Sequence, residues 1–538
     1  MRPPPLLRRA APAAAESASG EHAVDAPAVR RLPSLRLDGL PRTVVLVAAV
    51  AALTGLATVL RLRALTAPYW IDEGISVGIA SHPLGEIPGL LRLDGSPPLY
   101  YVVLHVWISL FGSAPTATHA LSAIFAIACV PAAYWAVAPF GAWAALSGAA
   151  IMALSPYVGL YADETRMYSL LLLLGLAVCG AFVRAFIFGR RAHIATFAVF
   201  AALTLYTHAW GAFLVGAAGL GWLLLLVLGP NRRRLLLDGV IGFGGAAVLF
   251  APWLPTLLYQ AAHTGAPWSH RPSGRSLVRA MSRIWSGRRA EEVLLVTAAA
   301  GLVVALVQGR GPTRRAVLTL LLMAVATLGS AYAYSRYRSP AWAIRYLVVV
   351  LAPFAVVAAL GLGRLRALGP AVVAAIALLV WHGRPTVSTL SHKSNVTAVA
   401  KELRPDLPPG TVVFSTQPEQ VPLLAHDLPP GMRFVTPLGP VADARVMDWR
   451  DAMPRLRNAH YDPVLGRRLR RMSRGQRLLF VQPQFGNPDA PWTRRIRFIA
   501  RKWGRAVRHS TLMRRVRVIV PAHGYSRSTV TARLLVRR

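Results

Sequence analysis

Two pairs of adjacent carboxylates are the residues of this sequence best suited to acid–base chemistry. Asp72 and Glu73 stand in the run PYWIDEG, with Trp70 beside them, a few residues after an uncharged apolar stretch. Asp163 and Glu164 stand just before another long apolar run. Adjacent carboxylates are common in solvated loops, and acidic residues at a helix start also complement the helix dipole. Aromatic neighbours that exclude water favour a functional role for the first pair.

Further polar candidates lie among aromatic residues near the ends of apolar stretches. Asp94 precedes a Pro-Pro turn, and Tyr101 and His105 follow that turn. Their spacing of four residues places Tyr101 and His105 on one face if the segment is a helix. His208 lies in the hinge THAWG between two apolar runs. The structural alternatives are an aromatic belt at the membrane surface and a capping or packed histidine.

Two arginines next to tyrosines are candidates for binding an anion. Arg166 is followed by Tyr168, and Arg345 is followed by Tyr346 at the start of an apolar run. A planar guanidinium suits bidentate binding of a phosphate group. Arg166 could instead pair with the nearby Asp163, and Arg345 could bind lipid headgroups.

The composition is that of a membrane protein with a polar tail. Of the 538 residues, 54% are hydrophobic and only 15% are charged, with a mean hydropathy of +0.45. A soluble chain carries roughly a quarter charged residues. The net charge is +38, but basic residues in loops that stay in the cytoplasm explain much of it, so nucleic acid is not the expected partner. Of the 60 basic residues 57 are Arg, which together with the abundant Ala indicates a GC-rich genome such as that of an actinobacterium.

The expected fold class is mainly α, a polytopic transmembrane helical bundle of about eleven spans followed by an α/β domain. The spans are predicted at 43–60, 117–137, 141–157, 169–188, 193–208, 209–228, 235–256, 292–308, 316–334, 344–362 and 367–382. If the N-terminus is in the cytoplasm, the four Arg-rich loops between the spans also lie in the cytoplasm only when the short apolar stretch 97–111 does not cross the membrane. That stretch is therefore placed along the outer surface. A crossing there, compensated by an error elsewhere, is the competing topology.

Three regions follow from this pattern. Residues 1–42 are rich in Pro, Ala and Arg and are expected to form a disordered cytoplasmic leader. Residues 43–383 form the membrane domain. Residues 384–538 contain the short β-rich runs TVVFS, RLLFVQP and VRVIVP, which predict an extracytoplasmic α/β domain. The two cysteines lie in apolar runs and are read as packing residues. The protein is expected in the plasma membrane, with membrane lipids as neighbours.

The order of these motifs resembles the C-type glycosyltransferases, and specifically the protein mannosyltransferase and aminoarabinose transferase group, glycosyltransferase family 39. The resemblance covers about residues 40–365. It rests on five motifs in order: W-x-D-E at 70–73, PPLYY…H.W at 97–107, SP…E.R.Y.L at 155–170, TH…G at 207–211 and RYL…P at 345–353. Family members take a sugar from a polyprenyl-phosphate carrier and transfer it outside the cytoplasm to an acceptor, which can be a glycan, a lipid or a protein.

The resemblance implies roles for individual residues. Asp72 would be the general base in an inverting displacement, and Arg345 and Arg166 would stabilise the leaving phosphate. Asp163 and Glu164 match a second acidic position that orients the acceptor or an arginine. The expected catalytic set is Asp72, Glu73, Asp163 and Glu164. The expected substrate-binding set is Trp70, Asp94, Tyr101, His105, Arg166, Tyr168, His208, Arg345 and Tyr346. Glu73 is also expected to help shape the sugar pocket. No cofactor is certain; a divalent metal is left open, although no ligand spacing defines a site.

Two other functions remain open from the sequence. A transporter or flippase of lipid-linked sugars would share the many spans and the outer cations, but should show internal repeats and ionisable or broken helices near the midplane. A membrane-anchored protein that binds anionic cell-wall polymer would explain the basic tail, but would leave Asp72 without a role. The sequence does not indicate which sugar is moved or which acceptor receives it.

Overall fold

The structure is a computed structural model that describes residues 41–538 except 286, 310, 380–389, 486–489 and 522–524. The chain divides into two compact units, Met1–Val45 and Leu46–Arg538, and the features below belong to the second except for the first turn of the helix Arg42–Arg61. Almost all of the predicted leader, 1–42, lies outside the described residues, and so does the predicted domain boundary at residue 383.

Long apolar helices make up the first part of the described chain. Eight helical segments are long and apolar enough to cross a membrane: Arg42–Arg61, Pro115–Phe140, Tyr168–Ile187, Gly211–Leu228, Arg232–His263, Arg288–Gln308, Pro312–Arg338 and Ile344–Gly363. The bent pair α6 (Ala142–Leu154) and α7 (Pro156–Ala162) makes a ninth if it is one span. The shorter apolar helices α9 (Ala192–Thr207) and α17 (Leu368–Leu379) coincide with the two remaining predicted spans. The chain is a multi-pass membrane protein.

The core of the helical part lies around two helices. These are α8 (Tyr168–Phe182) and α16 (Val348–Gly363). The most apolar stretches of the helical segments that contain them are 94% and 83% buried inside the protein. Both are apolar on every side, which is the pattern of a helix that is surrounded by other helices. The helices packed on them include α5 (Pro115–Val137), α6, α9, α10 (Gly211–Leu228), α14 (Arg288–Gln308) and α15 (Pro312–Ala333), and α11 (Arg232–Phe250) packs outside α9. Their outward side chains, such as Val248 and Val307, are exposed and apolar, as a lipid-facing surface requires.

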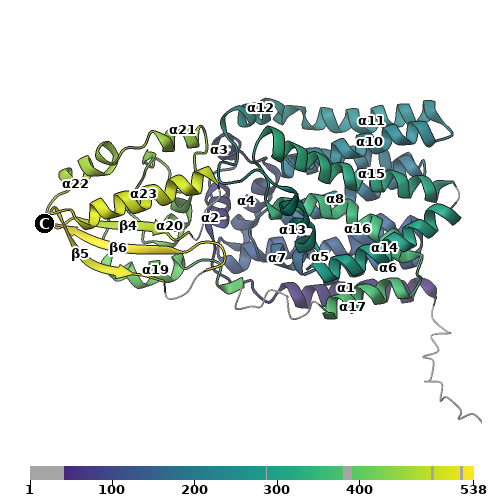
Figure 1. Cartoon of the computed structure of the whole chain (residues 1–538), viewed down its shortest axis with the longest axis horizontal. Helices are drawn as coiled ribbons and strands as arrows, with labels where there is room; N and C mark the ends of the chain where they lie inside the picture. The colour runs from purple at the N-terminus through teal and green to yellow at the C-terminus, as the bar shows by residue number, and fades with distance from the viewer. Residues whose placement is uncertain (1–40, 286, 310, 380–389, 486–489, 522–524) are drawn as a thin grey trace, which may run out of the picture. The chain divides into compact units, whose positions relative to one another are not determined.

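Short helices gather at one end of the long ones. They are α2 (Ile71–Ala80), α3 (Ile87–Asp94), α4 (Leu99–Phe111), α12 (Leu254–His263) and α13 (Gly274–Ile284). Figure 1 shows α2, α3 and α4 between the long helices and the strands. α4 is the predicted outer segment 97–111. Its 13 residues rise only about 20 Å, which is short of the roughly 30 Å of a hydrocarbon core.

The residues after 390 form an α/β arrangement around one six-stranded sheet. The strand order is β3-β2-β1-β4-β6-β5. The strands are β1 (Val412–Ser415), β2 (Arg433–Thr436), β3 (Gly439–Pro440), β4 (Arg477–Pro483), β5 (Met513–Ile519) and β6 (Val530–Arg537). β1 is parallel to β2 and β4, whereas β3, β6 and β5 pair antiparallel with their neighbours. The three predicted β-rich runs are β1, β4 and β5. Together with the helical bundle, this sheet confirms the predicted fold class.

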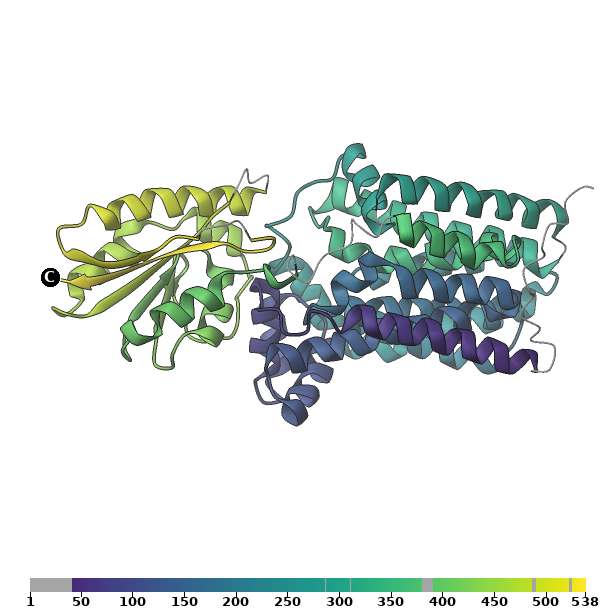
Figure 2. The same ribbon diagram turned by 90° about the horizontal axis from the view of Figure 1, so that it is seen from below.

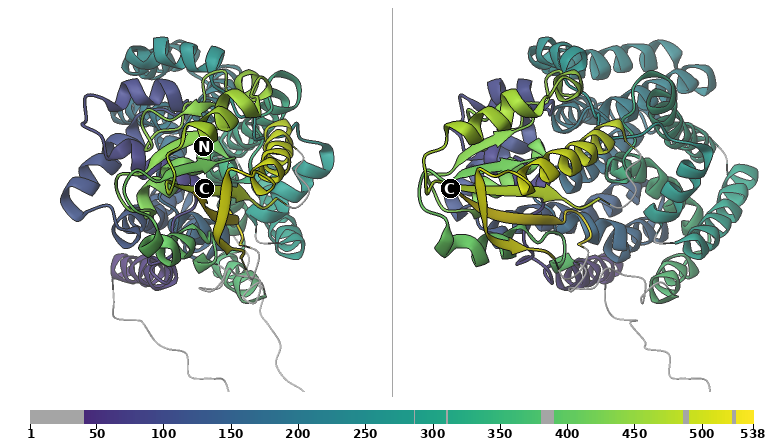
Figure 3. Two further views of the ribbon diagram at one scale, coloured as in Figure 1. Left: turned by 90° about the vertical axis from the view of Figure 1, so that its left-hand side faces the viewer. Right: turned by 60° about the vertical axis from the view of Figure 1, so that its left-hand side comes forward.

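Helices cover both faces of this sheet. Successive side chains of a strand point to opposite faces. In β1, Phe414 packs in one buried cluster with Trp503 of α23 (Pro491–Arg508), while Val413 packs in another with residues of α19 (Val396–Leu403) and α20 (Val421–Asp427). Figures 2 and 3 show α23 on one side of the strands and α19 and α20 on the other. Because both faces are covered, β1 is buried at all four residues.

Helix α2 packs directly against the α/β part. A Cβ atom at Gly74 would come within 2.8 Å of the Leu423 Cα in α20, and one at Gly78 would come within 2.1 Å of the Arg445 carbonyl oxygen. Only glycine permits such an approach of two backbones. The helix that carries the first acidic pair is therefore held between the long helices and the sheet domain.

Candidate active site

The centre of the site is a carboxylate next to a guanidinium. Asp72 lies in the first turn of α2, and Arg345 lies in the short 3-10 turn η5 (Ile344–Leu347) that leads into α16. A terminal nitrogen of Arg345 is 3.4 Å from Asp72 Oδ2, and each side chain is 18% exposed. The Arg345 guanidinium also lies 4.4 Å from the centre of the Trp268 ring. Two motifs that are far apart in the sequence thus meet at one point that a substrate can reach.

Arg166 supports the turn that carries Asp72. Its Nη1 donates to Ser76 Oγ at 2.8 Å and to the backbone oxygen of Asp72 at 3.2 Å. Among the described residues no ion pair joins it to Asp163. Tyr101 donates to Asp94 Oδ2 at 3.3 Å, and burial raises the pKa of Asp94. The charge of Arg166 acts against that rise, so Arg166, Asp94 and Tyr101 form one polar group beside Asp72.

Glu73 is fully buried, and both of its oxygens have partners. Oε1 lies 2.6 Å from His119 Nε2 and accepts from the Thr165 backbone nitrogen at 2.8 Å; Oε2 accepts from Lys393 Nζ at 2.9 Å and from the Trp70 backbone nitrogen at 3.1 Å. Burial alone would raise the pKa of Glu73, but the charge of Lys393 and the contact with His119 bring it down to about 2. The carboxylate joins four separate segments, which favours a positioning role for Glu73.

The second acidic pair is also buried. Glu164 Oε1 accepts from Arg527 at 2.7 Å, and the Arg527 guanidinium lies 5.2 Å from the Trp70 ring centre. Burial raises the pKa of Asp163 to about 7, and the charge of Lys393 acts against that rise. Asp163 Oδ1 and Glu164 Oε2 have no hydrogen-bond partner within the described structure. The second acidic pair thus combines one ion-paired carboxylate oxygen with two buried oxygens that lack a hydrogen-bond partner.

An aromatic wall stands beside Arg345. Tyr346 packs against His208 with ring centres 4.5 Å apart, and Tyr168 lies 6.2 Å from Tyr346. His208 Nδ1 accepts from the Trp210 backbone nitrogen at 3.0 Å. Burial, with the charges of nearby arginines, lowers the pKa of His208 to about 3, so this ring is neutral. A neutral ring among aromatic residues can pack against a sugar without competing for its phosphate.

His105 lies apart from the other candidates. Its Nδ1 is 2.9 Å from the carbonyl oxygen of Ala80, the last residue of α2. Asp72 is eight residues earlier in the same helix, a rise of about 12 Å. The structure thus gives His105 a contact that joins α4 to the end of α2, and does not bring it next to Asp72.

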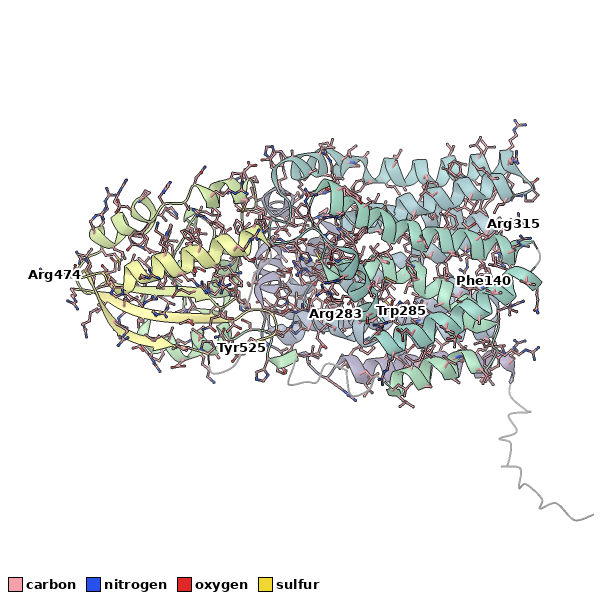
Figure 4. All side chains as sticks on the ribbon, viewed as in Figure 1. Phe140, Arg283, Trp285, Arg315, Arg474 and Tyr525 are labelled. Carbon is pink, nitrogen blue, oxygen red and sulfur yellow. The ribbon has the colours of Figure 1, made fainter. Side chains whose placement is uncertain are left out.

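A cavity of about 780 Å³ opens next to Arg345. It is lined by α7, α13, the segments around 268–270 and 342–345, and Arg527. Four arginines line it, Arg279, Arg283, Arg345 and Arg527, and none of its lining residues is acidic. Figure 4 shows Arg283 where the short helices lie, far from Arg315 at the opposite end of the long helices. Such a cavity is suited to an anionic ligand.

The described residues contain no group of three or more His, Cys, Asp or Glu side chains that could hold a metal ion. Cys129 and Cys179 are both free and buried. The described side chains around Asp72 do not form such a group, and a divalent metal stays a prediction.

Three contributors to the site do not stand out in the sequence: His119, Lys393 and Arg527. The sequence singles out Lys393 in one way only, because it is one of just three lysines in the chain. It is buried and also donates to the Asp163 carbonyl oxygen at 2.8 Å. The expected residues Asp72, Glu73, Asp163, Glu164, Trp70, Asp94, Tyr101, Arg166, Tyr168, His208, Arg345 and Tyr346 do gather in one region, as the contacts above describe.

Comparison with known proteins supports the fold. No protein family matches the sequence, and no curated protein matches it either. The structure of ArnT from Cupriavidus metallidurans in the apo state is similar over 91% of this chain and 98% of that chain, at 14% identity and a TM-score of 0.60. The same protein bound to undecaprenyl phosphate gives a TM-score of 0.58 at 14% identity, with the same coverage.

A third similar structure is the arabinofuranosyltransferase AftD from Mycobacteria. It matches over 93% of this chain and 40% of that chain, at 14% identity and a TM-score of 0.51. The chain therefore has the fold of the C-type glycosyltransferases, as the order of its motifs predicts. These likenesses do not address the source organism, so the actinobacterial origin stays a prediction.

Proposed function

We propose that this protein, which has the fold of a C-type glycosyltransferase, transfers a monosaccharide from a polyprenyl-phosphate donor to an acceptor hydroxyl outside the cytoplasm. One observation carries the proposal. Asp72 and Arg345, a base and a cation, lie 3.4 Å apart beside a cavity that is lined by four arginines and no acidic residue. The capture of undecaprenyl phosphate by ArnT, a protein of the same fold, supports a lipid phosphate as the ligand.

The donor phosphate would occupy the arginine-lined cavity. Arg345 and Arg527 are its innermost cations, and Arg279 and Arg283, on one face of α13, are more exposed. Nε of Arg345 is buried without a hydrogen-bond partner within the described structure. Fixed donors aimed at a charge that develops in the transition state each contribute about 10²–10³-fold in rate. The phosphate would replace Asp72 as the partner of Arg345 and so release the base.

The reaction is an inverting single displacement. Asp72 takes the proton of the acceptor hydroxyl as its oxygen attacks the anomeric carbon of the donor sugar. The bond between that carbon and the phosphate oxygen breaks, and polyprenyl phosphate leaves with the electron pair. The negative charge that gathers on the phosphate is stabilised by Arg345 and Arg527. A new glycosidic bond and a protonated Asp72 result, and proton loss to water restores the base.

The buried polar residues around Asp72 would hold it in place. Glu73 fixes the first turn of α2 through Lys393 and His119, and Arg166 holds the Asp72 carbonyl oxygen. Glu164 orients Arg527 at 2.7 Å. In this proposal Arg166 is a positioning residue, and the aromatic wall of Tyr168, His208 and Tyr346 shapes the sugar pocket.

The proposed orientation puts the N-terminus in the cytoplasm, and the site and the sheet domain outside. The distribution of basic loops supports it. The Arg-rich loops 189–193, 231–234, 308–315 and 362–368 join the long helices, and Arg315, in one of them, is at the end opposite to the site in Figure 4. Short basic loops tend to stay in the cytoplasm, which supports a site on the other side of the membrane.

A transfer assay tests this proposal. Membranes that contain the wild type or the Asp72→Asn variant are given a panel of labelled polyprenyl-phosphate sugars, and the label is followed into lipid, glycan and protein fractions. Asp462→Asn is the matched control, because Asp462 is 58% exposed and pairs with Arg470 far from the site. Transfer by the wild type and the control that collapses in Asp72→Asn supports the proposal. Transfer that survives in Asp72→Asn contradicts the role of the base, and label that crosses the membrane unchanged favours a transporter.

A further inference from the structure

Helix α23 carries a row of arginines on the face that points away from the sheet. Its other face is apolar and buried against the strands. At about 100° per residue, the five arginines lie within about 80° of one another around the helix axis, and the row is about 21 Å long. Four of them are exposed and Arg497 is partly buried. The row, called the basic stripe below, consists of Arg494, Arg497, Arg501, Arg505 and Arg508.

The charges of the basic stripe are not compensated. Elsewhere in the sheet domain arginines have acidic partners: Arg517 lies 2.7 Å from Glu402, and Arg455 lies 3.0 Å from Asp448. No arginine of the stripe forms an ion pair within the described residues. After residue 489 the sequence has 14 Arg and Lys and neither Asp nor Glu. The outer face of α23 is therefore a strongly positive surface.

Repulsion within the stripe acts against the stability of the free protein. Its arginines stand three or four residues apart, and like charges at that spacing destabilise a helix. The repulsion extends to the neighbouring strands. Burial lowers the pKa of Arg533 in β6, and the charges of Arg508 and Arg515 lower it further. An anionic ligand would relieve this repulsion, so the cluster is better suited to binding than to holding the fold together.

One end of α23 lies at the arginine-lined cavity. The Trp492 backbone nitrogen donates to the Pro267 carbonyl oxygen at 3.4 Å. The residue after Pro267 is Trp268, which lines that cavity and packs on Arg345. Figures 1 and 2 show α23 running from the side of the short helices along the sheet, away from the long helices. A long ligand on the stripe would thus have one end beside the cavity.

An exposed aromatic ring lies among these cations. Phe498 is 50% exposed on the outer face of α23. Its ring centre is 5.2 Å from the Arg495 guanidinium and 5.8 Å from Lys502 Nζ. The ring offers an apolar surface to the C–H face of a sugar, and the cations beside it can bind carboxylate or phosphate groups on the same chain. A layer of lipid headgroups would instead meet only the near end of the stripe, because α23 runs away from the long helices.

We propose that the basic stripe, together with Phe498, binds an anionic polysaccharide outside the cytoplasm, and that this polymer is the acceptor, held with one end at the arginine-lined cavity. The inference rests on the proposed function and names its acceptor class. Such a polymer has hydroxyls for the reaction and negative charges repeated along an extended chain. Its contacts with successive arginines act together because they belong to one chain, so each can be weak.

Binding without a donor tests the stripe separately from catalysis. The purified full-length chain in nonionic detergent is titrated by calorimetry with polygalacturonate and phosphomannan, which carry carboxylates and phosphates. Neutral dextran and phosphatidylglycerol vesicles are the comparison ligands. We expect one of the anionic polymers to bind and dextran not to bind. The affinity should fall about tenfold or more between about 0.1 M and about 1 M salt, because the Debye length shortens from about 10 Å to about 3 Å.

A triple variant identifies the surface that binds. Arg501→Gln, Arg505→Gln and Arg508→Gln together should weaken polymer binding about tenfold or more, and lysine at the same three positions should restore most of it. The control removes the same charge from the opposite side of the domain by Lys401→Gln, Arg404→Gln and Arg433→Gln. All six side chains are exposed, so both variants should fold like the wild type. Polymer binding that survives in the stripe variant, or that falls equally in the control, overturns the site. Binding to the vesicles but to neither polymer overturns it as well and assigns the stripe to the membrane surface.

The transfer assay gives the second arm. Labelled glycan is separated by anion exchange, and we expect the label in the anionic polysaccharide. At limiting acceptor the stripe variant should transfer about tenfold less or lower still, and the control variant should equal the wild type. Label in neutral glycan, lipid or protein alone overturns the role of the anionic polymer as acceptor. Polymer binding that depends on the stripe, without transfer from any donor, supports the binding surface and contradicts the proposed function instead.

Discussion

The buried ion pair of Glu73 and Lys393 should be a major determinant of stability. Lys393→Met removes the cation and leaves the fully buried carboxylate with His119 as its remaining ionisable partner. The pKa of Glu73 lies at about 2 against an ordinary value of 4.5, and at about 1.4 kcal/mol per pKa unit this is about 3 kcal/mol of stabilisation. Loss of one member of a buried pair typically costs about 3–5 kcal/mol. We therefore expect Lys393→Met to lower stability by about 3 kcal/mol.

The assay is the thermal unfolding midpoint of the detergent-purified chain at two pH values. Because the pKa of Glu73 is lowered, the pair contributes fully above pH 4.5 and its contribution is lost as pH falls toward 2. In Lys393→Met the buried carboxyl can take up a proton instead. The decrease in unfolding midpoint relative to the wild type should therefore be smaller at pH 5 than at pH 7.5. The double variant Glu73→Gln with Lys393→Met removes both charges and should recover part of the loss. A deficit that is the same at both pH values, with no recovery in the double variant, would refute the reasoning.

Three further predictions concern the same region. Arg345→Lys keeps the charge but loses the planar guanidinium, so transfer should fall by about 10²-fold while expression is unchanged; an unaltered rate would exclude Arg345 as a phosphate ligand. Arg527→Gln should raise the donor KM and also lower the unfolding midpoint, because Arg527 is part of the cavity wall and the ion-pair partner of the buried Glu164; kinetics at varied donor concentration and the unfolding midpoint check this. Asp163 has its pKa raised to about 7, so wild-type stability should decrease as pH rises from about 4 to 7 and stay level above that. Asp163→Asn should flatten this dependence, which unfolding midpoints across that pH range would show.

The membrane helices could be predicted from the sequence because each depends on local information. An uncharged run of about 20 residues is enough to identify a span, and each predicted span coincides with a helix. The sheet was harder, since pairing depends on distant residues. Arg533 and Arg537 interrupt the apolar pattern of β6, so its sequence resembles a basic tail and not a strand. In the structure, however, β6 pairs with β4 over seven residues. β2 and β3 are only four and two residues long, too short for a periodic signal.

The site could be predicted only in part. Asp72 and Arg345 follow from the order of the motifs, because Asp72 comes after the first apolar run and Arg345 begins a later one. The residues that hold Asp72 in place do not, since His119 is 46 residues from Glu73, Lys393 is 320 residues from it, and Arg527 is 363 residues from Glu164. Such contacts arise when the sheet domain packs on α2, and no local pattern encodes them.

The most direct test of the central claim is the single-turnover rate of sugar transfer by Asp72→Asn, measured together with donor affinity. A general base contributes about 10²–10⁴-fold to a rate. We expect a fall of that size in Asp72→Asn, with donor affinity equal to or higher than that of the wild type because Arg345 no longer has a carboxylate partner. A transfer rate within a few-fold of the wild type, at equal protein level, would contradict it.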